Sequence, residues 1–107
     1  MAMTAEITTE DLAALLGTVH LVDVREAEEY TDGHVSGALF APLSALPDMT
    51  HQFRRDEVNY LICRSGGRSA KACEYLAGLG YDVVNIAGGT MAWVMGGRSV
   101  VAGDQPA

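Results

Sequence analysis

The segment VNYLICRSGGRSAKACEYLAGLG, residues 58–80, decides the fold. Its first five residues, Val58–Ile62, read as a buried strand. Ser69–Leu79 has the pattern of a helix, and Gly80 supplies a residue at which that helix can end. A strand, a short glycine-containing turn and a helix form the unit from which α/β proteins with parallel sheets are built.

The same alternation of strands and helices continues on both sides of this segment. Further strands are predicted at Val19–Val24, Ala38–Ala41 and Val83–Ile86. Further helices are predicted at Thr9–Leu16, Glu26–Tyr30, Leu43–Phe53 and Thr90–Met95. Pro47 weakens the prediction of a helix over 43–53. The pattern indicates an α/β fold with a mainly parallel sheet, and such sheets bind ligands beyond the carboxyl ends of their strands.

Composition and charge restrict the classes of protein to which the chain can belong. The 107 residues suit one domain, and 49% apolar residues suffice for a core. The net charge of −7 argues against nucleic-acid binding and a basic membrane contact, and no apolar run could span a bilayer. The two cysteines match neither a disulfide framework nor a zinc spacing, and Met1–Glu6 lacks a signal-peptide pattern. We therefore expect one domain over residues 1–107, in the cytoplasm, without a metal.

Cys63 is the candidate nucleophile because it directly follows the Val58–Ile62 strand and precedes a glycine-containing turn. Gly66 and Gly67 allow the backbone to turn so that several N–H groups point inward together. Those amides and the positive end of the following helix favour an anion in the loop. We therefore predict that Cys63 is a thiolate at neutral pH, and the thiolate is the reactive form of cysteine.

Positive charge is concentrated around this cysteine in an otherwise acidic chain. Arg64, Arg68 and Lys71 are three of the seven basic residues. No acidic residue lies between Val58 and Cys73. The alternative is a solvated helix start with a chance cysteine. It requires the strand, cysteine, glycines, arginines and helix to coincide, so we favour a reactive site.

Three segments, in order, resemble the rhodanese family. They are DVREAEEYTDGHVSGA (Asp23–Ala38), CRSGGRS (Cys63–Ser69) and NIAGGTMAW (Asn85–Trp93). The resemblance extends over about residues 6–102, and the three segments together are more specific than any one of them. It implies a rhodanese-like three-layer fold, with about five mainly parallel strands and helices on both faces. It also implies that Cys63 carries the transferred sulfur as a persulfide.

In this family the loop after the cysteine binds the sulfur donor, and its amides surround the sulfur. Matched residue by residue, the resemblance implies a substrate-binding set of Arg64, Ser65, Gly66, Gly67, Arg68 and Ser69. It also suggests that Asp23 and Arg25 brace the site, although an ordinary ion pair explains them equally well. His34 is expected to be structural rather than a general base, and Cys73 a core side chain rather than a resolving thiol.

Cysteine phosphatases also bind an anion with a loop and a helix, but their loop is one residue longer. Here four residues separate Cys63 from Arg68, so the loop should fit one sulfur atom and crowd a phosphoryl group. Mercaptopyruvate-using relatives have a loop without these arginines. The arginines therefore favour a doubly charged sulfur donor such as thiosulfate. The persulfide-bearing end of another protein is an alternative donor.

The sequence leaves three functions open. The first is a free-standing enzyme that moves sulfane sulfur from thiosulfate, through a Cys63 persulfide, to a thiol or to cyanide. The second is a sulfur-carrier module whose substrates are proteins, and the third is a regulatory binding domain without turnover. The intact Cys63 and its basic loop argue against the third. The expected partners are a small anionic sulfur donor and a thiol acceptor, a protein thiol included, and no cofactor is required.

Overall fold

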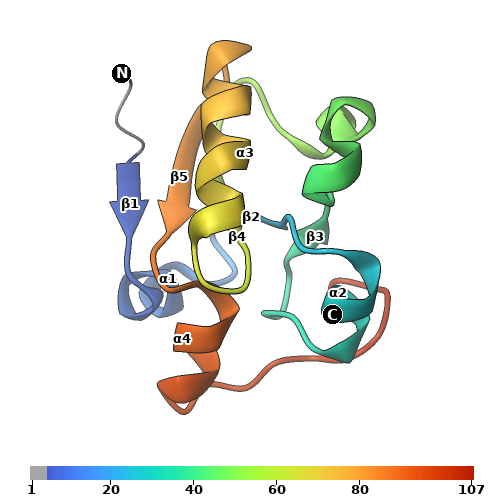
Figure 1. Ribbon diagram of the computed structural model, residues 1–107. Coiled ribbons are helices and arrows are strands. Elements are labelled where there is room, and N and C mark those ends of the chain that lie inside the picture. Colours follow the sequence, from blue (N-terminus) through green and yellow to red (C-terminus); the bar gives the residue numbers. More distant parts are fainter. Residues whose placement is uncertain (1–4) are drawn as a thin grey trace.

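The computed structural model describes residues 5–107 and contains one sheet with flanking helices (Figure 1). The strands are β1 (Ala5–Ile7), β2 (His20–Asp23), β3 (Leu39–Phe40), β4 (Val58–Ile62) and β5 (Asp82–Ile86). The helices are α1 (Thr9–Leu15), α2 (Ala27–Asp32), α3 (Gly67–Gly78), α4 (Gly89–Met95) and the 3-10 helix η1 (Leu43–Gln52). Most of Met1–Glu6, the segment compared above with signal peptides, lies outside the described residues.

The five strands form one sheet in the order β1-β5-β4-β2-β3, and every adjacent pair is parallel. β4 is therefore central, with β5 and β2 as its neighbours. The carboxyl ends of parallel strands share one edge, so the segments after β2, β4 and β5 converge there. The predicted α/β fold with a parallel sheet is confirmed, and so are its five strands.

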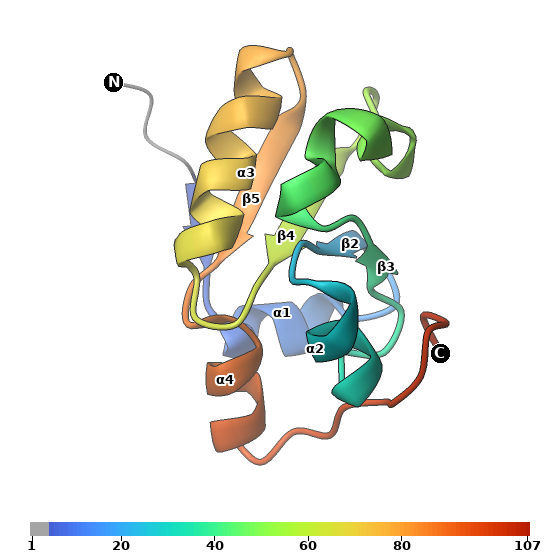
Figure 2. The same cartoon turned by 45° about the vertical axis from the view of Figure 1, so that its right-hand side comes forward.

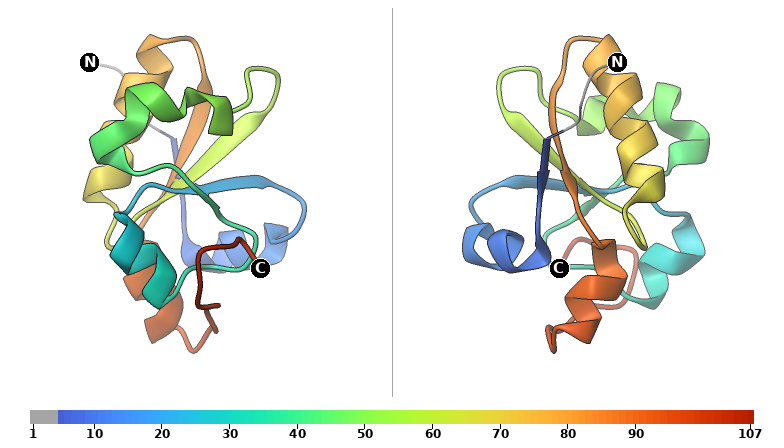
Figure 3. Two further views of the ribbon diagram at one scale, coloured as in Figure 1. Left: turned by 90° about the vertical axis from the view of Figure 1, so that its right-hand side faces the viewer. Right: turned by 60° about the vertical axis from the view of Figure 1, so that its left-hand side comes forward.

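Helices cover both faces of the sheet, which gives three layers (Figure 2, Figure 3). α3 and η1 pack on one face, where Leu61 of β4 and Leu76 of α3 belong to the same core cluster. α1 and α4 pack on the other face, where Ile62 joins a cluster with Leu12 and Trp93. Leu61 and Ile62 pack against helices on opposite faces of the sheet, because successive strand residues point to opposite faces. Within residues 5–107, no helix is long and apolar enough to cross a membrane.

Two elements differ from the sequence prediction: one strand is not predicted at all, and one helix begins two residues earlier than predicted. β1 is not predicted, because it has only three residues, two of them exposed, and so carries no readable alternation. α3 begins at Gly67 rather than at Ser69. Gly66 caps this helix in the left-handed conformation, with φ 111°, so the glycine pair both closes the turn and opens the helix.

The segment predicted as a helix over 43–53 is a 3-10 helix rather than an α-helix. Ala45 has non-helical angles (φ −122°, ψ 19°), and Pro47 lies inside the element. Proline has no amide hydrogen to donate to the preceding turn, which favours short, tight turns over a continuous α-helix. Leu46 of this element is buried against the α3 face of the sheet.

Candidate active site

Cys63 is the first residue after the central strand, and its side chain is buried, with 1% of its surface exposed. The Gly66 amide donates a hydrogen bond to Cys63 Sγ at 3.0 Å. The Ser69 hydroxyl, from the first turn of α3, lies 3.2 Å from the same sulfur. The loop and the helix therefore direct two donors at one sulfur atom, as the sequence predicts for an anion in this turn.

These donors change the ionisation of the thiol. Burial of the sulfur opposes ionisation, but the hydrogen bonds to the sulfur, led by the hydroxyl and amide of Ser69, together outweigh it and hold the pKa of Cys63 below its ordinary value. The amides of Gly66 and Ser65 act in the same direction. A lowered pKa increases the fraction of nucleophilic thiolate at neutral pH.

α4 supports the loop from the other side, because its first residues donate hydrogen bonds to carbonyl groups of the loop. The Thr90 amide and hydroxyl donate to the Cys63 carbonyl at 2.8 and 3.0 Å. The Met91 amide donates to the Arg64 carbonyl at 2.9 Å. Gly89 approaches so closely that a Cβ there would lie 2.4 Å from the Cys63 oxygen. The segment NIAGGTMAW therefore requires glycine at this position, because α4 must touch the active-site loop.

The two loop arginines have different surroundings. Arg68 forms a two-point ion pair with Glu29 of α2, with both nitrogen–oxygen distances at 2.7 Å. Arg68 holds the pKa of Glu29 at about 2, and Glu29 in turn raises the pKa of Arg68. Arg64 is exposed and, within residues 5–107, has no side-chain hydrogen bond or ion pair. Within residues 5–107, the Arg64 guanidinium is thus available to an anion, whereas the Arg68 guanidinium would have to share or leave Glu29. Binding of a sulfur donor by either arginine stays a prediction.

Asp23 and Arg25 form a buried ion pair at the carboxyl end of β2. The Arg25 guanidinium donates to Asp23 at 2.9–3.1 Å and to the Gly33 carbonyl at 2.7 Å. The pair therefore ties the end of β2 to the end of α2, the helix that carries Glu29. It makes no direct hydrogen bond to Cys63, so bracing would act through α2.

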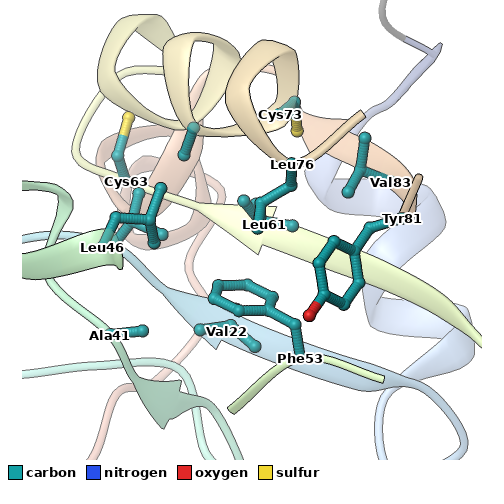
Figure 4. Packing of buried hydrophobic residues seen from close by; sticks show 12 residues of the cluster. Val22, Ala41, Leu46, Phe53, Leu61, Cys63, Cys73, Leu76, Tyr81 and Val83 are labelled. Carbon is teal, nitrogen blue, oxygen red and sulfur yellow. The ribbon is translucent and has the colours of Figure 1, made fainter. Parts of the chain in front are cut away.

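His34 and Cys73 have the structural surroundings expected of them. The His34 ring is buried, stacks on Tyr30 at 3.7 Å, and has both nitrogens within hydrogen-bond distance of the Tyr30 and Pro106 carbonyls. Cys73 is fully buried in the core cluster under α3, and desolvation raises its pKa to about 12 (Figure 4). Both cysteines are free thiols, and among the contacts of residues 5–107 only Cys63 has hydrogen-bond donors directed at its sulfur.

Three residues that position the site do not appear among the predicted site residues. Glu29 pairs with Arg68, Thr90 supports the Cys63 carbonyl, and Asn85 of β5 hydrogen-bonds to Ser69. Asn85 carries a sequence signal, because it is a polar residue inside the apolar strand 82–86. Glu29 and Thr90 carry none of their own, since acidic residues and threonines are common at exposed helix starts.

An apolar hollow of about 240 Å³ lies between η1 and α3, lined by Leu43, Leu46, Pro47 and Tyr75. Leu46 also belongs to the core cluster that contains Cys63 (Figure 4).

Within residues 5–107, no group of three or more His, Cys, Asp or Glu side chains could hold a metal ion.

The fold and the site define an α/β protein with a buried cysteine that accepts hydrogen bonds at the carboxyl end of its central strand. The family model for the rhodanese-like domain matches residues 8–95. The chain resembles the crystal structure of a rhodanese-like domain protein from Staphylococcus aureus, with a TM-score of 0.85 and 36% identity. That likeness covers 94% of this chain and 99% of the other.

Two curated relatives match along most of their length. The chain is 38% identical over 104 residues to a sulfurtransferase from Allochromatium vinosum, covering 94% of this chain and 97% of the relative. It is 31% identical over 96 residues to the thiosulfate sulfurtransferase GlpE from Tolumonas auensis, covering 87% and 91%. The chain belongs to the rhodanese-like domain family, and its relatives include sulfurtransferases.

Proposed function

We propose that this protein is a sulfurtransferase that carries sulfur as a persulfide on Cys63. The observation that carries the proposal is the pair of donors, the Gly66 amide and the Ser69 hydroxyl, at 3.0 and 3.2 Å from Cys63 Sγ. Donors at these distances stabilise a thiolate before reaction and again when the thiolate leaves. Cys73 has no such donors and a raised pKa, so it is a poor nucleophile.

The first step forms the persulfide. The Cys63 thiolate attacks the outer sulfur of thiosulfate, and the sulfur–sulfur bond of thiosulfate breaks. The bonding electrons leave with sulfite, and the outer sulfur remains on Cys63. The exposed Arg64 guanidinium can bind the sulfonate oxygens and stabilise the departing sulfite. The inward-pointing amides of the loop stabilise the negative charge of the persulfide.

The second step returns the enzyme to its starting form. An acceptor thiolate, or cyanide, attacks the outer sulfur of the persulfide, and the bond to Cys63 Sγ breaks. The acceptor leaves as a persulfide or as thiocyanate, and Cys63 is again a thiolate that accepts hydrogen bonds from Gly66 and Ser69. The electrons balance without a cofactor, because the acceptor supplies the pair that forms the new sulfur–sulfur or sulfur–carbon bond.

Thiosulfate is the proposed donor because Arg64, the residue after Cys63, carries a cation without a partner within residues 5–107, which suits an anionic leaving group. A relative that this chain matches over 91% of the relative's length is named a thiosulfate sulfurtransferase. A sulfur carrier that receives its sulfur from a protein persulfide is the second candidate. It would use the same Cys63 chemistry and differ only in donor and acceptor. The proposed location is the cytoplasm, where free thiols persist.

The test is thiosulfate-dependent thiocyanate formation by the purified chain. We expect turnover in the wild type, none above background in Cys63→Ser, and most of the wild-type rate in Cys73→Ser, which is the matched cysteine control. A protein that forms thiocyanate from a small-molecule persulfide but not from thiosulfate would favour the carrier. Turnover that survives in Cys63→Ser would contradict the proposal.

A further inference from the structure

A chain of hydrogen bonds connects the Cys63 sulfur to Glu6 on the edge strand. The Ser69 hydroxyl lies 3.2 Å from Cys63 Sγ and 2.5 Å from Asn85 Oδ1. The Asn85 amide nitrogen donates to the Glu6 carboxylate at 2.8 Å and to the Gly66 carbonyl at 3.2 Å. Ser69 and Asn85 are both buried, so water does not replace the hydrogen bond between them. The mechanism above uses Ser69 and leaves Asn85 and Glu6 without a role.

The orientation of the Asn85 amide is fixed by its partners. A carboxylate and a backbone carbonyl can only accept, so the amide nitrogen must face Glu6 and Gly66, and Asn85 Oδ1 must face Ser69. Glu6 and Asn85 are register partners in the β1–β5 ladder. Directly paired residues project from the same face of a sheet, which brings the carboxylate to the amide.

The Ser69 hydroxyl has one proton and more than one acceptor. Asn85 Oδ1 and Cys63 Sγ lie within hydrogen-bond distance, and the Gly66 carbonyl is a third neighbour at 3.3 Å. When Cys63 is a thiol, its own proton can be donated to Ser69 while Ser69 donates to Asn85. When Cys63 loses its proton to solvent, the charged sulfur becomes the stronger acceptor, and the hydroxyl has only to rotate toward it.

We propose that Asn85, held in orientation by Glu6, is a positioning residue that competes with the Cys63 sulfur for the single proton of the Ser69 hydroxyl. The hydroxyl then donates to the sulfur while the sulfur is charged, and returns to Asn85 when the charge moves to the outer sulfur of a persulfide. This inference rests on the proposed function only in taking Cys63 as the nucleophile. Asn85 sets how readily that nucleophile forms and touches no substrate.

Other charged and titratable groups surround Cys63 and must be separated from this effect. They are Arg64 in the loop, Arg68 and Cys73 on α3, Glu29 on α2, Glu6 on β1, and the Asp23–Arg25 pair after β2. A comparison of Asn85 variants with and without the Ser69 hydroxyl leaves these groups unchanged. If an Asn85 substitution still shifts the ionisation of Cys63 when the Ser69 hydroxyl is absent, that shift comes from these other groups and not from competition for the hydroxyl proton.

The experiment measures the rate of Cys63 alkylation against pH in a Cys73→Ser background, which leaves one thiol. Four proteins are compared: the parent, Asn85→Leu, Ser69→Ala and the double variant. We expect Asn85→Leu to lower the midpoint by several tenths of a pH unit, because the hydroxyl loses its competing acceptor. In the Ser69→Ala background the same substitution should leave the midpoint unchanged. A raised or unchanged midpoint in Asn85→Leu, or an equal shift in both backgrounds, overturns the proposal.

Glu6→Gln provides a second route, because Glu6 is exposed and its loss removes no core packing. A glutamine side chain can donate as well as accept, so Asn85 is no longer obliged to keep its amide nitrogen on that side and can turn and stop accepting from Ser69. We expect a lower alkylation midpoint, and a larger shift with Ser69 present than in Ser69→Ala.

Glu10→Gln, at an exposed site on α1, is the matched charge control. A shift equal in both backgrounds, or no larger than that of Glu10→Gln, contradicts the inference. Alkylation needs no sulfur donor, so failure here is distinct from failure of sulfur transfer.

Discussion

Arg68, at the start of α3, is held by Glu29 of α2 through two contacts of 2.7 Å. One of the two arginines that the family resemblance assigns to substrate binding is therefore already partnered, whereas the other, Arg64, has no side-chain partner within residues 5–107. The ion pair also fastens α2 to the active-site loop, 39 residues away in sequence. The Glu29 carboxylate thus holds both the attachment of α2 to the loop and the guanidinium that we expect to bind the sulfur donor.

Glu29→Gln should free Arg68 and strengthen the binding of a dianionic donor. We expect KM for thiosulfate to fall several-fold with a smaller change in kcat, measured by thiocyanate formation. Glu28→Gln removes the same charge from an exposed neighbour on α2 without touching Arg68, and should leave KM nearly unchanged. A higher KM in Glu29→Gln would mean that attachment of the loop outweighs the freed cation.

The Arg68–Glu29 ion pair should make the free energy of unfolding depend on pH in the acid range. Glu29 has a pKa of about 2 in the folded protein, below its value of about 4.3 in an unfolded chain. Its stabilising contribution is therefore complete above about pH 4.3 and is lost as the pH falls toward 2. Because the pair is partly exposed, we expect this contribution to be below about 1 kcal/mol. Urea unfolding of wild type and Glu29→Gln should converge at low pH, and a constant difference would contradict the assignment.

The hydrogen bonds to Cys63 predict a thiolate at neutral pH. The midpoint of alkylation against pH should lie clearly below the ordinary cysteine value of about 8.5. Ser69→Ala removes one of the two donors closest to the sulfur and should raise the midpoint toward that value. An unshifted midpoint in the wild type would contradict the proposed role of the loop, whatever the transfer activity.

Gly89 and Gly97 provide a matched test of the contact between α4 and the loop. Both have positive φ, 59° and 83°, so alanine at either position incurs backbone strain of about 1–2 kcal/mol. Only at Gly89 would the new Cβ meet the Cys63 and Arg64 backbone, at 2.4–2.7 Å, whereas nothing lies within 4 Å of it at Gly97. Gly89→Ala should therefore lose more stability by urea unfolding and most of its sulfur transfer. Equal losses in the two variants would show that the close approach does not matter.

The length of the loop should select sulfur over phosphorus. The four residues between Cys63 and Arg68 leave a ring of amides one residue shorter than in a cysteine phosphatase. One glycine inserted between Gly66 and Gly67 should widen the ring, weaken sulfur transfer and slightly improve hydrolysis of an aryl phosphate. The unaltered chain should show no hydrolysis above the Cys63→Ser background. Faster aryl phosphate hydrolysis than sulfur transfer would favour the phosphatase interpretation.

Local sequence was enough to predict the strand, loop and helix around Cys63. The apolar run Val58–Ile62 and the glycine pair act within a few residues, so their pattern is readable without the rest of the chain. β1 was missed because it is short and half exposed, and it is fixed only by pairing with β5. Pro47 signals that the helix predicted over 43–53 is weak, but the non-helical angles of Ala45, which make the segment a 3-10 helix with a kink, have no signature in sequence.

The supporting residues of the site were harder to predict than the nucleophile. Asn85 meets Ser69 across 16 residues, and Glu29 meets Arg68 across 39, so both contacts depend on how the sheet brings distant segments together. The resemblance placed both arginines at the substrate, because a motif records which residues are present and not which are already paired. The ion pair of Arg68 is visible only in three dimensions.

The most direct test of the account is the intact mass of the protein after incubation with thiosulfate and removal of excess reagent. The account predicts the addition of one sulfur atom, its loss on treatment with cyanide, and its position on Cys63 by peptide mapping. Cys73→Ser should gain the same mass, and Cys63→Ser should gain none. An unmodified wild type, or a sulfur carried on Cys73, would contradict the claim that Cys63 carries the transferred sulfur.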